Sequence, residues 1–210
     1  MARYIGPVCR RCRRASMKLY LKGVRCETAK CPIEKQWRNK PPGMHFWQRR
    51  RPSEYGLRLR EKQKLRWYYG VLERQFRRIF AEAQRSKGST GERLLLLMER
   101  RLDNVVYRLG FTSSRKAARQ LVNHGHIRVN GRMANVASQK VKAGDLIEVR
   151  NRKRSRDLVQ AWLTEEEGRV VPAWLSVEPS QLRGEVKALP SREDVSLQLN
   201  EQLIVEFCSR

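Results

Sequence analysis

The sequence predicts an α+β fold in which a series of helices precedes a small antiparallel sheet. Apolar residues recur at helical spacing between residues 53 and 123, which predicts several amphipathic helices. Asn130-Gly131 separates two short segments of alternating apolar and polar residues, a pattern typical of a tight β-hairpin. Four cysteines stand in two close pairs near the N-terminus, where core-forming residues are few. These three patterns together indicate a cysteine-bearing arm, helices and a sheet, in that order.

The four cysteines of the arm predict a metal site. Two residues separate Cys9 from Cys12, four separate Cys26 from Cys31, and thirteen lie between the pairs. A tetrahedral zinc ion needs four thiolates, and two short turns supply them at low entropic cost. Zinc is therefore the expected cofactor, and a four-iron four-sulfur cluster on the same thiolates is the alternative. Disulfides are less favoured, because the N-terminus lacks the apolar run of a secretion signal and cytoplasmic thiols stay reduced.

A proline-rich loop follows over residues 36–52, and its cations alternate with aromatic rings. Such a combination can stack on bases or cover the backbone of RNA, although rings packed within an ordinary loop fit the pattern equally well. The rings are Trp37, Phe46 and Trp47, and the cations are Arg49, Arg50 and Arg51.

Three helices are expected next. Ser53 can cap a helix over residues 53–69 that Gly70 ends, and a second helix spans residues 72–85. Ser89-x-x-Glu92 has the form of a capping box and opens a long third helix, whose apolar stripe continues to Leu109. The first of these helices has a heavily cationic face, made of Arg58, Arg60, Lys62, Lys64 and Arg66.

A short basic helix and a sheet complete the predicted core of the chain. The helix spans residues 114–123, with Ser114 as its cap and Gly125 at its end. Arg115, Lys116 and Arg119 are expected on the face opposite its apolar side. Strands are predicted at residues 126–129, 146–150, 174–177 and 185–189, and helices at 157–163 and 200–207. A basic helix face beside a small sheet suits a folded RNA; the simpler alternative is a solvated helix on an ordinary small domain.

The charge distribution favours a polyanionic partner. The formal net charge is +25. Residues 1–90 carry 25 basic and six acidic side chains, whereas residues 156–210 carry six basic and ten acidic ones. The first part of the chain is therefore expected to face phosphate, and the last part to meet protein. No apolar run is long enough to span a bilayer, and no lipidation motif is present, so a membrane partner is not expected.

Catalysis is not expected. The triplet Arg101-Leu102-Asp103 also occurs around the catalytic aspartate of pseudouridine synthases, but here it lies within an amphipathic helix without an accompanying base, and Asp103 is expected to be a solvated acid. His124 and His126 flank Gly125, where RNA contact and junction packing are both compatible with the sequence.

Three segments identify a family resemblance. Residues 101–111, 114–122 and 124–131 closely resemble small-subunit ribosomal protein four of bacteria, in its cysteine-bearing form. Residues 1–9, 51–55, 58–64 and 200–207 resemble it as well, so the likeness covers the whole chain in order. Ala137, Ala143, Cys208 and the segment 44–47 depart from the family pattern.

The resemblance implies a metal-knuckle N-terminal arm, a helical domain and an inserted RNA-binding domain of two helices on a small antiparallel sheet. It assigns residues 1–52 to the arm and loop, 53–92 with about 190–210 to the helical domain, and 93–189 to the RNA-binding domain. It also implies a structural, non-catalytic protein of the cytoplasmic ribosome. Such a protein binds the five-way junction in the 5′ domain of small-subunit rRNA early in assembly. It lies beside the channel through which messenger RNA enters and contacts small-subunit proteins three and five; messenger RNA is a further candidate partner.

Thirteen residues are expected to contact RNA on these grounds, and the metal ligands are the four cysteines of the arm. An RNA-modifying enzyme built on the same module is the alternative, but a catalytic domain of about 200 residues has no room here. A zinc-containing DNA-binding regulator would need a dimerising segment or a finger helix, which the sequence lacks. The expected RNA contacts are Arg49, Arg50, Arg51, Arg58, Lys62, Arg108, Arg115, Lys116, Arg119, His124, His126, Arg128 and Asn130.

Overall fold

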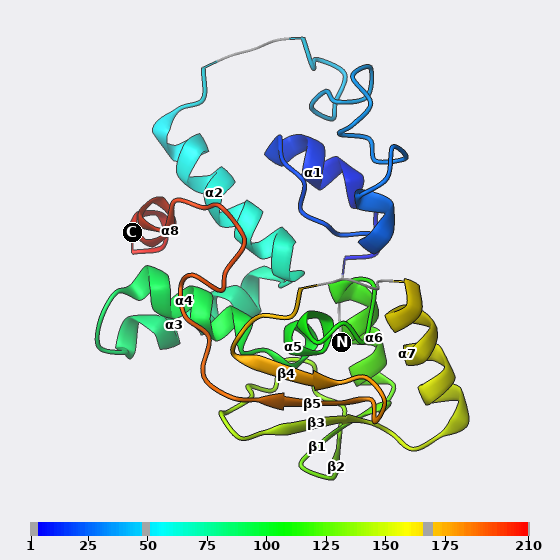
Figure 1. Cartoon of the computed structure of the whole chain (residues 1–210). Coiled ribbons are helices and arrows are strands. Elements are labelled where there is room, and N and C mark those ends of the chain that lie inside the picture. Colours follow the sequence, from blue (N-terminus) through cyan, green and yellow to red (C-terminus); the bar gives the residue numbers. More distant parts are fainter. Residues whose placement is uncertain (1–3, 48–50, 166–169, 210) are drawn as a thin grey trace. The chain divides into compact units, whose positions relative to one another are not determined.

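The computed structural model of the chain describes residues 4–47, 51–165 and 170–209 (Figure 1). The chain divides into two compact units. Unit 1 comprises Met1–Leu94 with Leu197–Arg210, and unit 2 comprises Leu95–Ser196. The sequence predicts domain boundaries near residues 52, 93 and 189; the units change at residues 95 and 197, and unit 1 holds both the predicted arm and the predicted helical domain. No helix in the described part of the chain is long and apolar enough to cross a membrane.

Unit 1 is helical. The predicted caps of its longest helix are confirmed: the Ser53 hydroxyl accepts a hydrogen bond from the Gly56 amide (3.2 Å), and Gly70 ends the helix with a φ of 65°. The C-terminal helix, which Asn200 caps as predicted, packs on this helix, with the Tyr55 and Phe207 rings 5.3 Å apart. The elements are α1 (Cys9–Ala15), a short 3-10 helix (Gly23–Cys26), α2 (Glu54–Tyr69), α3 (Glu73–Arg85), the first half of α4 (Thr90–Glu99) and α8 (Glu201–Cys208).

The single long helix predicted from Ser89 to Leu109 is wrong. The structure breaks it into α4 and α5 (Leu102–Arg108), with Arg101 in an extended conformation between them. Residues 137–141 take the backbone groups that the break releases: Leu102 N–H donates to the Gln139 carbonyl (2.8 Å), and Val141 N–H donates to the Arg100 carbonyl (2.9 Å). Long-range hydrogen bonds therefore override an uninterrupted apolar stripe.

Unit 2 is built on a five-stranded antiparallel sheet in the order β2-β1-β3-β5-β4. The predicted hairpin is confirmed, with Asn130 and Gly131 at φ values of 50° and 76° between β1 and β2. The helix predicted at 157–163 is longer in the structure, where it spans Lys153–Glu165. The strands predicted at 174–177 and 185–189 lie at Leu175–Glu178 and Arg183–Val186. Besides the second half of α4 and the whole of α5, the elements are α6 (Arg115–Asn123), β1 (Ile127–Val129), β2 (Arg132–Ala134), β3 (Leu146–Val149), α7 (Lys153–Glu165), β4 (Leu175–Glu178) and β5 (Arg183–Val186).

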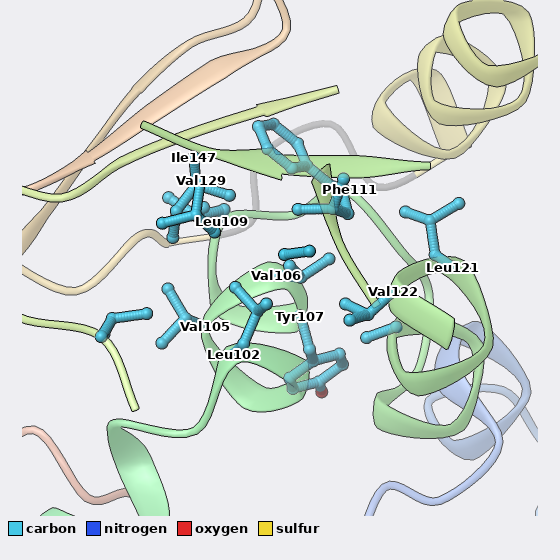
Figure 2. Packing of buried hydrophobic residues seen from close by; sticks show 14 of the residues in the cluster. Leu102, Val105, Val106, Tyr107, Leu109, Phe111, Leu121, Val122, Val129 and Ile147 are labelled. Carbon is cyan, nitrogen blue, oxygen red and sulfur yellow. The ribbon is translucent and has the colours of Figure 1, made fainter. Parts of the chain in front are cut away.

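One apolar core holds the helices of unit 2 against the sheet. Figure 2 shows side chains of α5 and α6 in one apolar cluster with Val129 and Ile147 of the sheet. Gly184 of β5 lies so close to α5 that an added Cβ would stand 2.6 Å from Leu109 Cδ2. The core thus fixes the position of α6 and of the hairpin, the two elements that carry the predicted RNA contacts.

Candidate nucleic-acid interface and cysteine cluster

A buried ion pair holds the start of α5. Arg101 Nε and Nη2 donate to the two carboxylate oxygens of Asp103 at 3.0 and 2.7 Å, and the two residues are only 1% and 4% exposed. Arg119 of α6 approaches the same carboxylate, with Nη1 3.5 Å from Oδ2. The expectation of a solvated Asp103 is therefore wrong, because two guanidinium groups from different elements neutralise it in the interior. Asp103 therefore has a structural role, as the buried partner of these arginines.

A second buried network joins α4, α5 and α6. The fully buried Glu99 carboxylate accepts from Arg108 Nη2 (2.9 Å) and from the side-chain amide of Asn104. The Oδ1 atom of Asn104 in turn accepts from Arg115 Nε (2.8 Å), and the Arg115 guanidinium stacks on the Tyr107 ring at 4.4 Å. These contacts link Arg108, Glu99, Asn104 and Arg115 into one buried network across the three helices.

Because of the two networks, the basic residues of α6 do not form one exposed face. The sequence places Arg115, Lys116 and Arg119 together on the solvent side. In the structure Lys116 is exposed, Arg115 is 8% exposed, and the side chain of Arg119 is 12% exposed. The prediction of one exposed arginine face is thus wrong for Arg115, because Asn104 and Tyr107 bind it from α5. Contact of these residues with RNA stays a prediction.

Basic side chains gather where α6, the sheet and α7 meet. We call His124, His126, Arg150 and Arg152 the junction patch. His126 Nδ1 lies 2.9 Å from the Ser155 hydroxyl of α7, and the Arg150 amide donates to the His126 carbonyl (2.7 Å). Burial lowers the pKa of His126, and the charges of His124, Arg150 and Arg152 lower it further. The fold therefore brings together two histidines and two arginines that are up to 28 residues apart in the sequence.

The two predicted residues of the hairpin have different roles. Asn130 is exposed, but its side chain donates to Asp145 (2.9 Å) and accepts from the Leu146 amide (2.8 Å), which ties the turn to β3. Arg128 lines a shallow pocket of about 270 Å³ together with Arg156 and Arg183. Glu148 lines the same pocket and accepts from Arg183 (3.0 Å), so one acid offsets part of its charge.

Sequence reasoning missed several exposed cations near these elements. Arg132 pairs with Val129 across the hairpin and is exposed at the start of the edge strand β2. Strict alternation puts Arg132 on the same face as the buried Ala134, so the pattern alone would not have found it; its place next to the turn on an edge strand exposes it. Arg152 was seen only as part of a basic run, and its place in the junction patch depends on the fold of α7 against β3.

In unit 1, the cationic face of α2 is largely paired with acids. Arg58 binds Glu54 and Glu206, and Lys62, which is 6% exposed, binds Glu73 at 2.8 Å while its ammonium lies 4.6 Å from the Phe207 ring. Lys64 and Arg66 are also in ion pairs, whereas Arg60 is exposed. Arg51 is exposed, and Arg49 and Arg50 lie outside the described residues.

The four cysteines of the arm are reduced thiols within electrostatic range of one another. Cys12, Cys26 and Cys31 are buried, and the Lys22 amide donates to Cys26 Sγ (3.4 Å). Burial raises the pKa of Cys12 to about 11, and the neighbouring cysteine sulfurs raise it as well. Over the described ranges, no three Cys, His, Asp or Glu side chains stand close enough to hold a metal ion. The soft donor set and the amide hydrogen bond fit zinc; the spacing of the sulfurs would have to close around it.

The chain matches two family models and is similar to several known proteins along its whole length. The model of the ribosomal protein S4/S9 N-terminal domain matches residues 3–99, and that of the S4 domain matches residues 100–147. The small ribosomal subunit protein uS4A of Symbiobacterium thermophilum is 57% identical over the full length of both chains. The corresponding uS4 proteins of Thermus thermophilus and of a Thermoanaerobacter species are 55% and 54% identical, again over the full length of both chains.

Proposed function

The chain belongs to the uS4 family of small-subunit ribosomal proteins, and we propose that it binds small-subunit rRNA early in assembly through exposed cations of both units. As a member of that family it is a structural component of the small ribosomal subunit and not an enzyme. Binding at the five-way junction of the 5′ domain, beside the channel through which messenger RNA enters, forms part of the proposal. So do contacts with small-subunit proteins three and five and a place in the cytoplasmic ribosome.

One observation carries the proposal: the fold sorts its cations into two sets. Arg101, Arg108 and Arg119 bind buried carboxylates and stabilise unit 2. The junction patch, by contrast, holds two cations, Arg150 and Arg152, that the structure pairs with no carboxylate among the described contacts. A patch of this kind attracts phosphate, and a rigid scaffold beneath it lets the protein select RNA by shape.

Zinc at Cys9, Cys12, Cys26 and Cys31 is part of the same proposal. Four thiolates would hold the ion, and the ion would cross-link α1 to the turn around Cys26 in a segment with a small apolar core. The burial of three of the sulfurs and the amide hydrogen bond to Cys26 support it. A four-iron four-sulfur cluster on the same residues is the alternative that elemental analysis and visible absorption distinguish.

Charge reversal tests the RNA interface. We expect Arg132→Glu and Arg152→Glu each to weaken binding of the full chain to the rRNA junction fragment by about tenfold, and to lower the salt dependence by about one phosphate contact. Lys187→Glu is the matched control, since it makes the same charge change at an exposed site in the acidic part of the chain. Equal affinity for all three variants, or binding that is insensitive to salt between 50 and 200 mM, would overturn the proposal.

A further inference from the structure

A cavity of about 720 Å³ lies at the proline-rich loop of unit 1, whereas the junction patch belongs to unit 2. Its lining combines three aromatic rings with three cations. The volume falls within the range of about 300–1,000 Å³ that is usual for small-molecule sites. The cavity is lined by Arg14, Asn39, Lys40, Pro41, Pro42, Gly43, Met44, His45, Phe46, Trp47 and Arg60.

The charge of the cavity selects for an anion. Arg14, Lys40 and Arg60 are exposed, and none of the described residues that line the cavity is acidic. This differs from the cationic face of α2, where neighbouring carboxylates neutralise Arg58 and Lys62. The three cations of the cavity come from three segments of unit 1: α1, the loop and α2.

The rings of the cavity have uncovered surface. Trp47 lies perpendicular to Phe46 (81°, centroids 5.2 Å apart) and nearly perpendicular to His45 (76°, 5.5 Å). Neither neighbour stacks on it, and Trp47 remains 61% exposed. The Lys40 ammonium lies 4.9 Å from the Phe46 ring, which places a positive charge next to an aromatic face. An exposed ring beside a cation is the arrangement on which nucleic-acid bases stack.

The loop is held in shape before any ligand binds. Pro41 and Pro42 fix two successive φ angles, and Gly43 adopts a φ of 129° that other residues rarely reach. Arg13 Nη1 donates to the Lys40 carbonyl (3.2 Å), which ties the loop to α1. A pre-shaped site loses less conformational entropy on binding than a flexible loop.

We propose that this cavity takes an unpaired base of single-stranded RNA. The base stacks on Trp47 or Phe46, and Arg14, Lys40 and Arg60 hold the phosphates on either side. The inference deepens the proposed function, since it rests on the chain being an RNA-binding protein, but it concerns another surface and another RNA conformation. An acidic peptide matches the cations as well, but it offers no planar group for the rings; RNA offers both.

Octamers of uridylate and adenylate test the proposal on the full-length chain. We expect Trp47→Leu to weaken binding of both octamers by about five- to 150-fold, the usual cost of losing one stacked base. Trp47→Phe should retain most of the affinity. Trp37→Leu is the matched control, because Trp37 is a comparably exposed ring of the same segment that does not line the cavity. The salt dependence should stay unchanged in Trp47→Leu and fall in Lys40→Gln.

The outcomes separate this inference from the proposed function. If Trp47→Leu binds the octamers as the native chain does, or if Trp37→Leu weakens them equally, the stacking site is wrong, whatever the junction fragment shows. If the native chain binds octamers through Trp47 but does not bind the junction fragment, the proposed function fails instead. Preferential Trp47-dependent binding of an octaglutamate peptide would also overturn the inference. Ultraviolet cross-linking of assembled subunits, with and without messenger RNA, then shows whether rRNA or messenger RNA supplies the base. If Trp47 cross-links to neither RNA, the site is wrong.

Discussion

Replacing Asp103 by Asn should destabilise unit 2 strongly. Asp103 is 4% exposed and binds Arg101, which is 1% exposed, through two hydrogen bonds. Asn keeps the volume of the side chain but removes its charge and one acceptor. Arg101 would then remain as a buried cation with a neutral partner, and Arg119 would lose the charge of the carboxylate that it approaches at 3.5 Å.

The size of the effect follows from the burial of the remaining charge. Removing one partner of a buried ion pair costs about 3–5 kcal/mol, and we expect about 3 kcal/mol here because Asn retains one oxygen for Arg101. With a urea dependence of about 1–3 kcal/mol per molar, this corresponds to a midpoint lower by about 1–3 M. In an exposed setting the same substitution would be worth less than about 0.5 kcal/mol.

Pulsed amide hydrogen exchange at increasing urea measures the unfolding of unit 2 alone, on peptides from residues 102–149. Asp157→Asn is the matched control, because Asp157 is an exposed aspartate of α7 in the same unit. The control should unfold with the native chain. If Asp103→Asn lowers the midpoint no more than Asp157→Asn does, the ion pair contributes nothing and the argument from burial is wrong.

Three further changes follow from the structure. Gly184→Ala should lower the melting temperature of the chain, at a cost of about 1–3 kcal/mol, because the new Cβ would meet Leu109 at 2.6 Å; a calorimetric melt that matches the native one contradicts this. The fold lowers the pKa of His126, so the unfolded chain binds that proton more tightly, and stability should fall as the pH drops below about 6.5. His126→Gln should flatten this dependence in urea titrations at pH 5–8, and an unchanged slope would exclude His126 as its source. Chelation of the proposed zinc should speed amide exchange in residues 9–31 and spare unit 2; elemental analysis that finds less than one metal per chain would refute the site.

The parts of the fold that depend on local chemistry could be predicted from the sequence. Ser53 caps the start of α2 and Gly70 ends it, Ser114 caps α6, and Asn130 with Gly131 forms the hairpin turn, each as predicted. In each case the deciding interaction joins residues three or four positions apart, or is a backbone conformation that few residues adopt. Such local interactions form in the same way whatever the rest of the chain does, so the sequence alone is enough to predict them.

The break between α4 and α5 could not be predicted in this way. Leu94, Met98, Leu102 and Val105 continue one apolar stripe through it, and both halves are helical. The break exists because residues 137–141 bind the backbone around Arg101, some 38 residues away along the chain. Burial of Asp103 has the same origin, since Arg101 leaves helical geometry at that point and turns its guanidinium onto the carboxylate.

The same non-local contacts limit what a count of charges says about RNA binding. The net charge of +25 includes Arg101, Arg108 and Arg119, whose partners are buried carboxylates in the free protein. Substituting Arg119 should therefore lower the stability of unit 2 before any RNA is added, and a loss of RNA affinity would follow from unfolding. Substituting Arg152 should leave that stability unchanged and alter only the salt dependence of binding. Measuring the stability of unit 2 and the salt dependence of RNA binding on both variants therefore assigns each arginine to the scaffold or to the interface. The helical wheel of α6 alone cannot separate these two roles.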